Sequence, residues 1–156
     1  MYINKVKINN YRSFRSFEAQ LQKLTIVVGE NDKGKTNFFT ALSLPLSGNQ
    51  IDFNQKRLSI SDINKDSVID FFTSIITNEA KENQLQKIPK VSVTIEFTDP
   101  KDSYEAALLA KWLVADGDKE TYQIRYDFKP KDDGDLLELV KATLTGKTIE
   151  EVNWFT

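Results

Sequence analysis

The chain has 156 residues, enough for one domain with a sizeable core, and its 40% hydrophobic and 28% charged residues are typical of a globular protein. It contains no cysteine and no histidine, which excludes disulfides, thiolate nucleophiles, Cys/His zinc sites and histidine-based acid–base catalysis. The formal net charge of −2 does not indicate nucleic-acid binding. No stretch has the apolar length of a signal peptide or a membrane span, so we expect a cytoplasmic chain with no membrane partner.

Charge is distributed unevenly along the chain. Residues 1–50 carry seven Lys and Arg against three Asp and Glu, whereas residues 101–156 carry eight against twelve. A basic beginning suits a polyanion such as ATP or nucleic acid. A second explanation is equally good: Lys5, Lys7 and Lys23 could simply lie on the solvated surface of a strand.

The first 46 residues predict a strand hairpin, a buried strand and a helix. Residues 2–9 alternate as an edge or half-buried strand does, and residues 14–21 return as a second strand. The apolar run Leu24 to Val28 predicts a buried parallel strand. The helix that follows Lys35 should end near Pro45, because proline disfavours a helical residue before it. The apolar face of this helix consists of Phe38, Phe39, Ala41 and Leu42.

Periodicity and capping residues predict the remaining elements. Residues 47–60 read as a loop, with one short extended piece at 58–60. The segments that follow are a helix over 66–81 with Asp66 as a possible cap, a polar linker over 81–90, a strand over 91–97, a helix over 103–115 capped by Asp102 or Ser103, and paired strands over 121–128 and 136–145. The apolar tail, residues 149–156, has no stop signal and is typical of a chain interrupted in mid-domain.

Residues 29–36 match the phosphate-loop pattern G-x-x-x-x-G-K-[ST], also called Walker A. Gly34 lets the backbone approach an anion closely because it has no Cβ. Successive backbone N–H groups and the positive end of the following helix can then cradle phosphate oxygens. Lys35 would supply an ammonium for the β- and γ-phosphates and Thr36 a hydroxyl ligand for Mg²⁺. The alternative is a glycine turn with no ligand, but the preceding strand and following helix are the context that the motif requires.

Together with the phosphate loop, the segment Asn10-Tyr11-Arg12-Ser13-Phe14 resembles the N-terminus of ABC-type ATPases of the SMC/RecF class. The likeness is closest to the OLD family of ATP-dependent endonucleases, which join an N-terminal ATPase to a C-terminal Toprim nuclease and serve in bacterial anti-phage defence. Residues 58–63 and 91–97 are similar to the part of such heads that leads into their antiparallel lobe. The resemblance implies a mixed α/β fold, an incomplete P-loop NTPase head of ABC/SMC type with an antiparallel β lobe.

The resemblance also implies ATP and Mg²⁺ as cofactors. Arg12 would reach the nucleotide phosphates from the hairpin, and the alternative is a surface arginine in a turn. Two residues of the loop depart from the family pattern, because Asp32 and Lys33 replace smaller side chains. We expect Asp32 to face solvent. Thr36 stands in place of the more usual serine as the metal ligand. The expected nucleotide-binding residues are Arg12, Gly29, Glu30, Asn31, Asp32, Lys33, Gly34, Lys35, Thr36 and Asn37.

No apolar run ending in Asp-Glu and no Toprim carboxylate set occurs in the sequence, so we expect the catalytic residues to lie outside it. Residues 1–156 would be the N-terminal part of an ABC-type ATPase domain, with the hairpin, phosphate loop and first helix in 1–60 and a helix plus an antiparallel β/α lobe in 61–156. Such a chain would bind ATP with little turnover.

The resemblance implies three kinds of partner besides ATP. The ATPase heads would form a homodimer, DNA would bind through regions outside this chain, and a defence-system partner is possible. The alternatives are a DNA-repair or chromosome-maintenance ATPase head of RecF or SMC type, and a standalone binding module without enzymatic activity.

Overall fold

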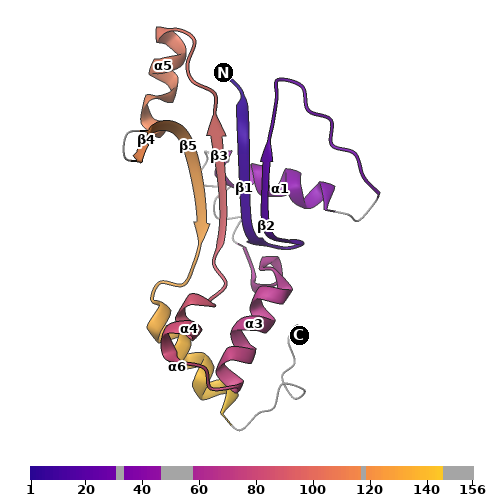
Figure 1. Ribbon diagram of the computed structural model, residues 1–156, viewed down its shortest axis with the longest axis vertical. Helices are drawn as coiled ribbons and strands as arrows, with labels where there is room; N and C mark the ends of the chain where they lie inside the picture. Colours follow the sequence, from indigo (N-terminus) through magenta and orange to yellow (C-terminus); the bar gives the residue numbers. More distant parts are fainter. Residues whose placement is uncertain (31–33, 47–57, 117–118, 146–156) are drawn as a thin grey trace.

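An antiparallel β-sheet forms the centre of the computed structural model, which describes residues 1–30, 34–46, 58–116 and 119–145 (Figure 1). In this part of the chain the sheet has five strands in the order β2-β1-β3-β5-β4. The strands are β1 (Ile3–Tyr11), β2 (Phe14–Gln20), β3 (Val91–Phe97), β4 (Leu113–Asp116) and β5 (Lys119–Phe128). The predicted mixed α/β class with an antiparallel lobe is confirmed.

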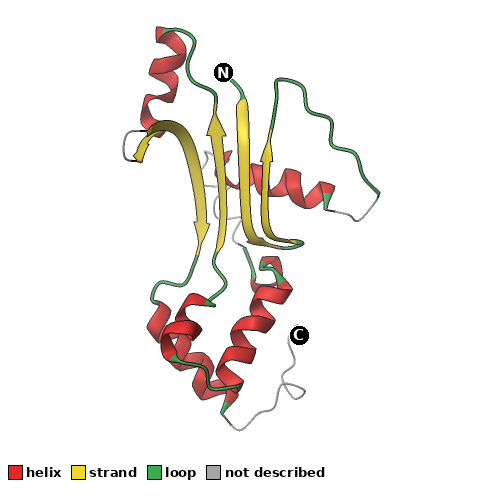
Figure 2. Cartoon of the chain, viewed as in Figure 1, coloured by secondary structure: helices red, strands yellow, loops and turns green. Residues whose placement is uncertain are grey.

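Helix α1 (Lys35–Leu46) crosses one face of the sheet and closes the main core (Figure 2). Alternation in β1 and β3 directs one set of side chains to this face, and the register places Val6 opposite Ile95 and Ile8 opposite Val93. All four of these side chains are fully buried. The helix contributes the buried residues Phe38, Ala41 and Leu44. Burial of this apolar face stabilises both the sheet and the position of α1.

Three further helices gather at one end of the sheet (Figure 1). They are α3 (Lys65–Ile76), α4 (Lys81–Gln86) and α6 (Asp133–Leu144), and their shared core is built on Phe71, Ile88 and Leu137. The 3-10 turn η1 (Ile60–Asp62) precedes α3. At the opposite end of the sheet lie α5 (Ser103–Leu109) and the 3-10 turn η2 (Ala110–Trp112). None of the described helices is both long and apolar enough to cross a bilayer.

The run Leu24 to Val28 is not the buried strand that its composition predicts. Leu24 is 81% exposed, Ile26 76% and Val28 85%, and the segment has no strand pairing among the described residues. A buried parallel strand needs hydrogen-bonded neighbours and a cover on both faces. The apolar composition therefore marks a segment that requires partners, and the described part of the fold does not supply them.

The second wrong prediction is the strand over residues 136–145, which is part of helix α6. The Oδ1 atom of Asp132 accepts a hydrogen bond from the backbone N–H of Asp135 at 2.9 Å, which caps the first turn. Leu137 and Leu144 are seven residues apart, so they share one buried helix face. Strand β5 pairs instead with β3 and β4.

Several boundaries also differ from the predictions. Asn64 rather than Asp66 caps α3, residues 81–86 form a helix rather than a linker, and Ile60 begins a 3-10 turn rather than ending an extended piece. The predicted helix 103–115 ends at Leu109 and continues into η2 and β4. Phe39 is 57% exposed rather than packed on the sheet. The predicted loop over 47–57 and the apolar tail lie outside the described residues.

Asn64 joins the β1–β2 turn to the start of α3. Its backbone N–H donates to the carbonyl of Asn10 at 2.9 Å, and its Nδ2 donates to the carbonyl of Arg12 at 2.8 Å. Its Oδ1 accepts from the N–H of Ser67 at 3.2 Å and so caps the helix. Asn64 is only 5% exposed, so its own polar groups have little access to water and depend on these partners. The side chain of Asn64 therefore forms hydrogen bonds with both the β1–β2 turn and the start of α3.

We expect Asn64→Ala to lower the free energy of unfolding by about 2–3 kcal/mol, since it removes a helix cap and leaves the partly buried carbonyl of Arg12 without its donor. Asp132→Ala, which removes an exposed cap, should lower it by about 1 kcal/mol. Urea denaturation measures both variants. Equal effects would show that the contact with Arg12 adds nothing to the cap.

Candidate phosphate-binding site

The residue before α1 is best a glycine for two reasons, its backbone conformation and the close approach of neighbouring side chains. Gly34 has φ +93°, a left-handed conformation that favours glycine, and its carbonyl accepts the N–H of Phe38 at 2.8 Å. A Cβ at this position would lie 3.2 Å from the Oγ of Ser13 and 3.4 Å from the Cζ of Phe14. The β1–β2 turn therefore lies directly against the end of the predicted phosphate loop.

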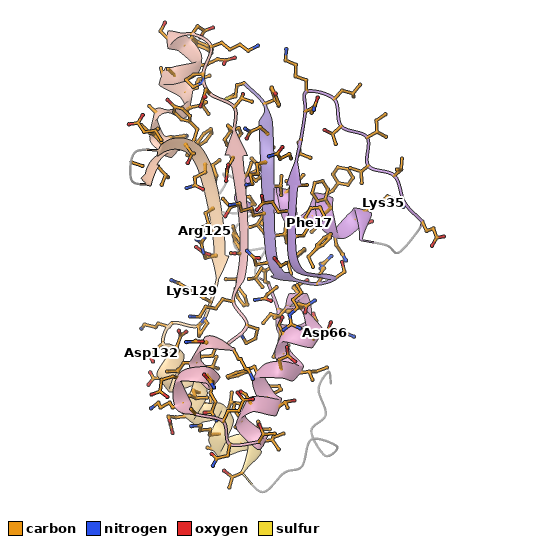
Figure 3. The ribbon with its side chains drawn as sticks, in the orientation of Figure 1. Phe17, Lys35, Asp66, Arg125, Lys129 and Asp132 are labelled. Carbon is orange, nitrogen blue, oxygen red and sulfur yellow. The ribbon has the colours of Figure 1, made fainter. Side chains whose placement is uncertain are left out.

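The first residues of α1 carry the groups predicted to bind phosphate and metal. The Nζ of Lys35 donates to the carbonyls of Gly29 and Glu30, the latter at 2.6 Å, so its ammonium lies over the start of the loop (Figure 3). Thr36 is exposed, and its hydroxyl makes no hydrogen bond within the described residues. The first turn of α1 contains no acidic residue. The positive end of the helix is thus not neutralised by its own side chains.

Arg12 reaches this helix terminus from the turn between β1 and β2. Its Nη1 donates to the Oδ1 of Asn37 at 3.2 Å, and Asn37 lies in the first turn of α1. The Nδ2 of Asn37 donates in turn to the Oγ of Ser13 at 3.0 Å. The structure therefore brings Arg12, Gly34, Lys35, Thr36 and Asn37 into one region, while Gly29 and Glu30 contact it through Lys35. The predicted residues Asn31, Asp32 and Lys33 lie outside the described part of the chain.

Asp62 is a member of this cluster that sequence reasoning missed. Its Oδ1 accepts from the Nε of Arg12 at 2.9 Å, and its Oδ2 accepts from the N–H of Ser59 at 3.0 Å. Burial acts to raise the pKa of Asp62, but the hydrogen bonds from Ser59 and Arg12 outweigh it and hold the pKa below its usual value. The Ser-x-x-Asp spacing of residues 59–62 is the sequence signal for this turn.

The lysines of β1 and the tyrosine beside Arg12 have structural roles. Lys5 pairs with Glu18 across two strands at 2.6 Å, and Lys7 lies 3.8 Å from both Glu18 and Glu96. Tyr11 is fully buried in the main core. A strand surface thus accounts for Lys5 and Lys7, and packing in the main core accounts for Tyr11.

A separate hollow of about 290 Å³ lies between α3, α6 and the end of β5. The described residues of its walls are almost all apolar, and Lys129 is the single charged residue among them. Phosphate requires converging N–H groups and cations. The hollow does not provide them, so the start of α1 is the better candidate for an anion.

The cluster at α1 can hold a nucleotide phosphate chain. It combines a glycine whose conformation excludes a Cβ, a helix N-terminus, one lysine and one arginine. For Mg²⁺ the chain offers the Thr36 hydroxyl, and no group of three or more acidic residues suited to a metal occurs among the described residues. A cation here would therefore draw most of its ligands from phosphate oxygens and water.

Comparison with known proteins identifies the family of this chain. A protein-family model, that of the AAA ATPase domain, matches residues 1–151 of this chain. The chain belongs to the AAA ATPase domain family. Endonuclease GajA of Bacillus cereus (strain VD045) is 28% identical over 124 residues, which cover 78% of this chain and 21% of that protein. The chain thus spans about a fifth of that relative's length.

One solved structure comes from work on ATP-driven dimerization and DNA stimulated activation of SMC ATPases. Its alignment covers 92% of this chain and 80% of the solved chain, with 18% sequence identity and a TM-score of 0.46. The resemblance drawn from the phosphate loop and the Asn10–Phe14 segment is confirmed by membership of the ATPase family and by the endonuclease relative.

The two glycines of the loop should respond differently to substitution by alanine. Gly34→Ala should lower the free energy of unfolding by about 1–2 kcal/mol, because a side chain is strained in a left-handed conformation. Gly29 has no described atom within 4 Å of a Cβ, so Gly29→Ala should change it by less than about 0.5 kcal/mol. Chemical denaturation compares them, and similar values for the two would contradict the role assigned to Gly34.

The lowered pKa of Asp62 predicts a pH dependence of stability. Ionised Asp62 stabilises the fold fully above its unfolded pKa of roughly 4, and this contribution is lost as pH falls through the lower folded-state pKa. Asp62→Asn should therefore show a shallower loss of stability than the unaltered chain between roughly pH 5 and pH 3. Urea denaturation at several pH values tests this, and parallel curves would refute it.

Proposed function

We propose that this chain is the ATP-binding N-terminal lobe of an OLD-like nuclease, in which ATP binding or hydrolysis regulates DNA cleavage in bacterial anti-phage defence. The observation that most supports ATP binding is the contact between the β1–β2 turn and the start of α1. This contact brings Arg12 to the same helix terminus as Lys35. Two cations and a helix N-terminus form a strong site for a polyphosphate.

In this proposal each residue has a separate role. Backbone N–H groups from Gly29 to Thr36 cradle the phosphate oxygens. Lys35 transfers its hydrogen bonds from the loop carbonyls to the β- and γ-phosphates, and Arg12 contacts the phosphates from the other side. Bound Mg²⁺ would neutralise phosphate charge, with the Thr36 hydroxyl as its ligand from this chain. Asn37 holds the hairpin against α1.

The domain organisation is part of the same proposal. Residues 1–156 form the N-terminal part of an ABC-type ATPase domain, and the exposed run Leu24 to Val28 pairs with strands outside the described residues. Its apolar composition and high exposure support this, since such a run is unfavourable in water. Catalytic carboxylates and a facing second head would complete the site, so this chain by itself binds ATP with little turnover.

The link to DNA cleavage is supported by the relative named an endonuclease. DNA would bind outside this chain, the heads would form a homodimer, and a further defence protein is a possible partner. Where the chain is joined to its nuclease, regulation would appear as DNA cleavage that responds to ATP. Loss of this response on mutation of the phosphate loop would support the proposal, and cleavage indifferent to ATP would overturn its regulatory part.

We expect Lys35→Ala to abolish measurable Mg²⁺-ATP binding while leaving the fold intact, because the Lys35 side chain is only partly buried and lies on the loop. Isothermal titration calorimetry measures the affinity, and circular dichroism with urea denaturation verifies the fold. Lys131→Ala, which removes an exposed lysine beside α6, is the matched control and should bind ATP normally.

Two results would contradict this assignment. Unchanged ATP affinity in Lys35→Ala would refute the role of the phosphate loop. Brisk ATP turnover by the isolated chain would refute the claim that further residues are needed for hydrolysis.

A further inference from the structure

The arginine that reaches the phosphate loop is held in an unusual backbone conformation. Arg12 has φ +47°, in the left-handed region that non-glycine residues rarely adopt. Its N–H donates to the carbonyl of Asp62 at 2.8 Å, and its carbonyl accepts from Asn64 at 2.8 Å. Strained residues persist where surrounding structure holds them, and they concentrate at binding sites. Hydrogen bonds with residues 62–64 keep Arg12 in this conformation.

The guanidinium of Arg12 is held by hydrogen bonds at two of its three nitrogens. Nε donates to Asp62 and Nη1 to Asn37. An arginine has five N–H donors, so three remain, and they have no acceptor among the described residues. The centre of the guanidinium lies 5.2 Å from the ring centroid of Tyr11. The group is thus oriented by three neighbours while its remaining donors stay available for an anion.

Asp62 is itself held rigidly. Its second carboxylate oxygen accepts both the N–H of Ser59 at 3.0 Å and the hydroxyl of Ser59 at 3.2 Å. Its side chain is 16% exposed, compared with 37% for that of Arg12. A carboxylate anchored by its own turn restricts the rotamers of its partner more than a mobile surface carboxylate does.

We propose that Asp62 is a positioning residue for nucleotide binding, which holds the guanidinium of Arg12 so that its remaining N–H groups point to the phosphates in the loop. This inference rests on the proposed ATP-binding function. Asp62 touches no phosphate; it lowers the entropy that Arg12 loses on binding. One carboxylate oxygen of Asp62 accepts from Ser59 and, among the described residues, the other accepts only the Nε of Arg12, so the pair leaves the Nη donors of Arg12 that do not bind Asn37 for an anion.

A second ion pair on the same hairpin provides a matched control. Arg15 pairs with Asp70 of α3, but these side chains are 60% and 45% exposed. Neither residue contacts Asn37 or Gly34 through a described hydrogen bond. Asp70→Ala therefore removes a carboxylate from an arginine of the hairpin without disturbing the phosphate loop.

The test is a double-mutant cycle on Mg²⁺-ATP affinity, measured by isothermal titration calorimetry on the full chain. Asp62→Ala should weaken binding about five- to tenfold, Arg12→Ala about tenfold or more, and Asp70→Ala less than twofold. In the Arg12→Ala background, Asp62→Ala should weaken binding by less than about twofold further. The main-chain bonds between the β1–β2 turn and residues 62–64 survive these changes, and urea denaturation verifies that each variant folds.

Asp62→Asn keeps one oxygen acceptor and should fall between the unaltered chain and Asp62→Ala, so it replaces Asp62→Ala if that variant fails to fold. Unchanged or tighter ATP binding in the Asp62 variants, while Arg12→Ala weakens it, would overturn the positioning role alone. An equal effect of Asp62→Ala with and without Arg12 would also overturn it. Absence of ATP binding by the unaltered chain would overturn the proposed function together with this inference.

Discussion

The hydrogen bonds that Asn64 makes to the β1–β2 turn are the constraint on which the candidate site depends. This turn contains two non-glycine residues with positive φ, Asn10 at 53° and Arg12 at 47°, which are unfavourable in isolation. Asn64 binds the carbonyls of both and is at the same time the N-cap of α3. The hairpin, the η1 turn and α3 are therefore joined at one point by a buried polar residue whose hydrogen-bonding groups all find partners.

The same turn positions the phosphate loop. Ser13 lies against Gly34, and Arg12 and Ser13 both bind Asn37 in the first turn of α1. Helix α1 is held from its other side by Phe38, Ala41 and Leu44, which pack on the sheet. The helix terminus that would receive phosphate is thus fixed by polar contacts at its start and by apolar burial along its length. A site built on elements fixed in this way loses little conformational entropy when it binds.

The parts of the site that sequence reasoning found are those set by adjacent residues. Gly34, Lys35 and Thr36 follow from one short pattern, because a left-handed glycine and a helix start are determined locally. Asp62 was missed because it lies fifty residues from Arg12 in the chain, and only folding brings the two together. The prediction of a strand over residues 136–145 is wrong because Asp132, in the turn-rich segment before it, caps a helix. Alternation predicted β1, β3 and β5, and the turn after β1 predicted β2 as the returning strand, which makes four of the five described strands.

The sequence alone determined the phosphate-loop pattern, the helix that follows it and the exclusion of thiol and histidine chemistry, since these depend on residue type and short spacing. Tertiary structure decided which side chains surround that loop and what covers each apolar segment. Leu24 to Val28 illustrates the difference: composition states that the run is apolar, but burial requires neighbouring strands, and the segment is exposed in the described fold. Hydrophobicity measures the tendency to leave water, whereas the long-range contacts that satisfy it are a property of the whole fold.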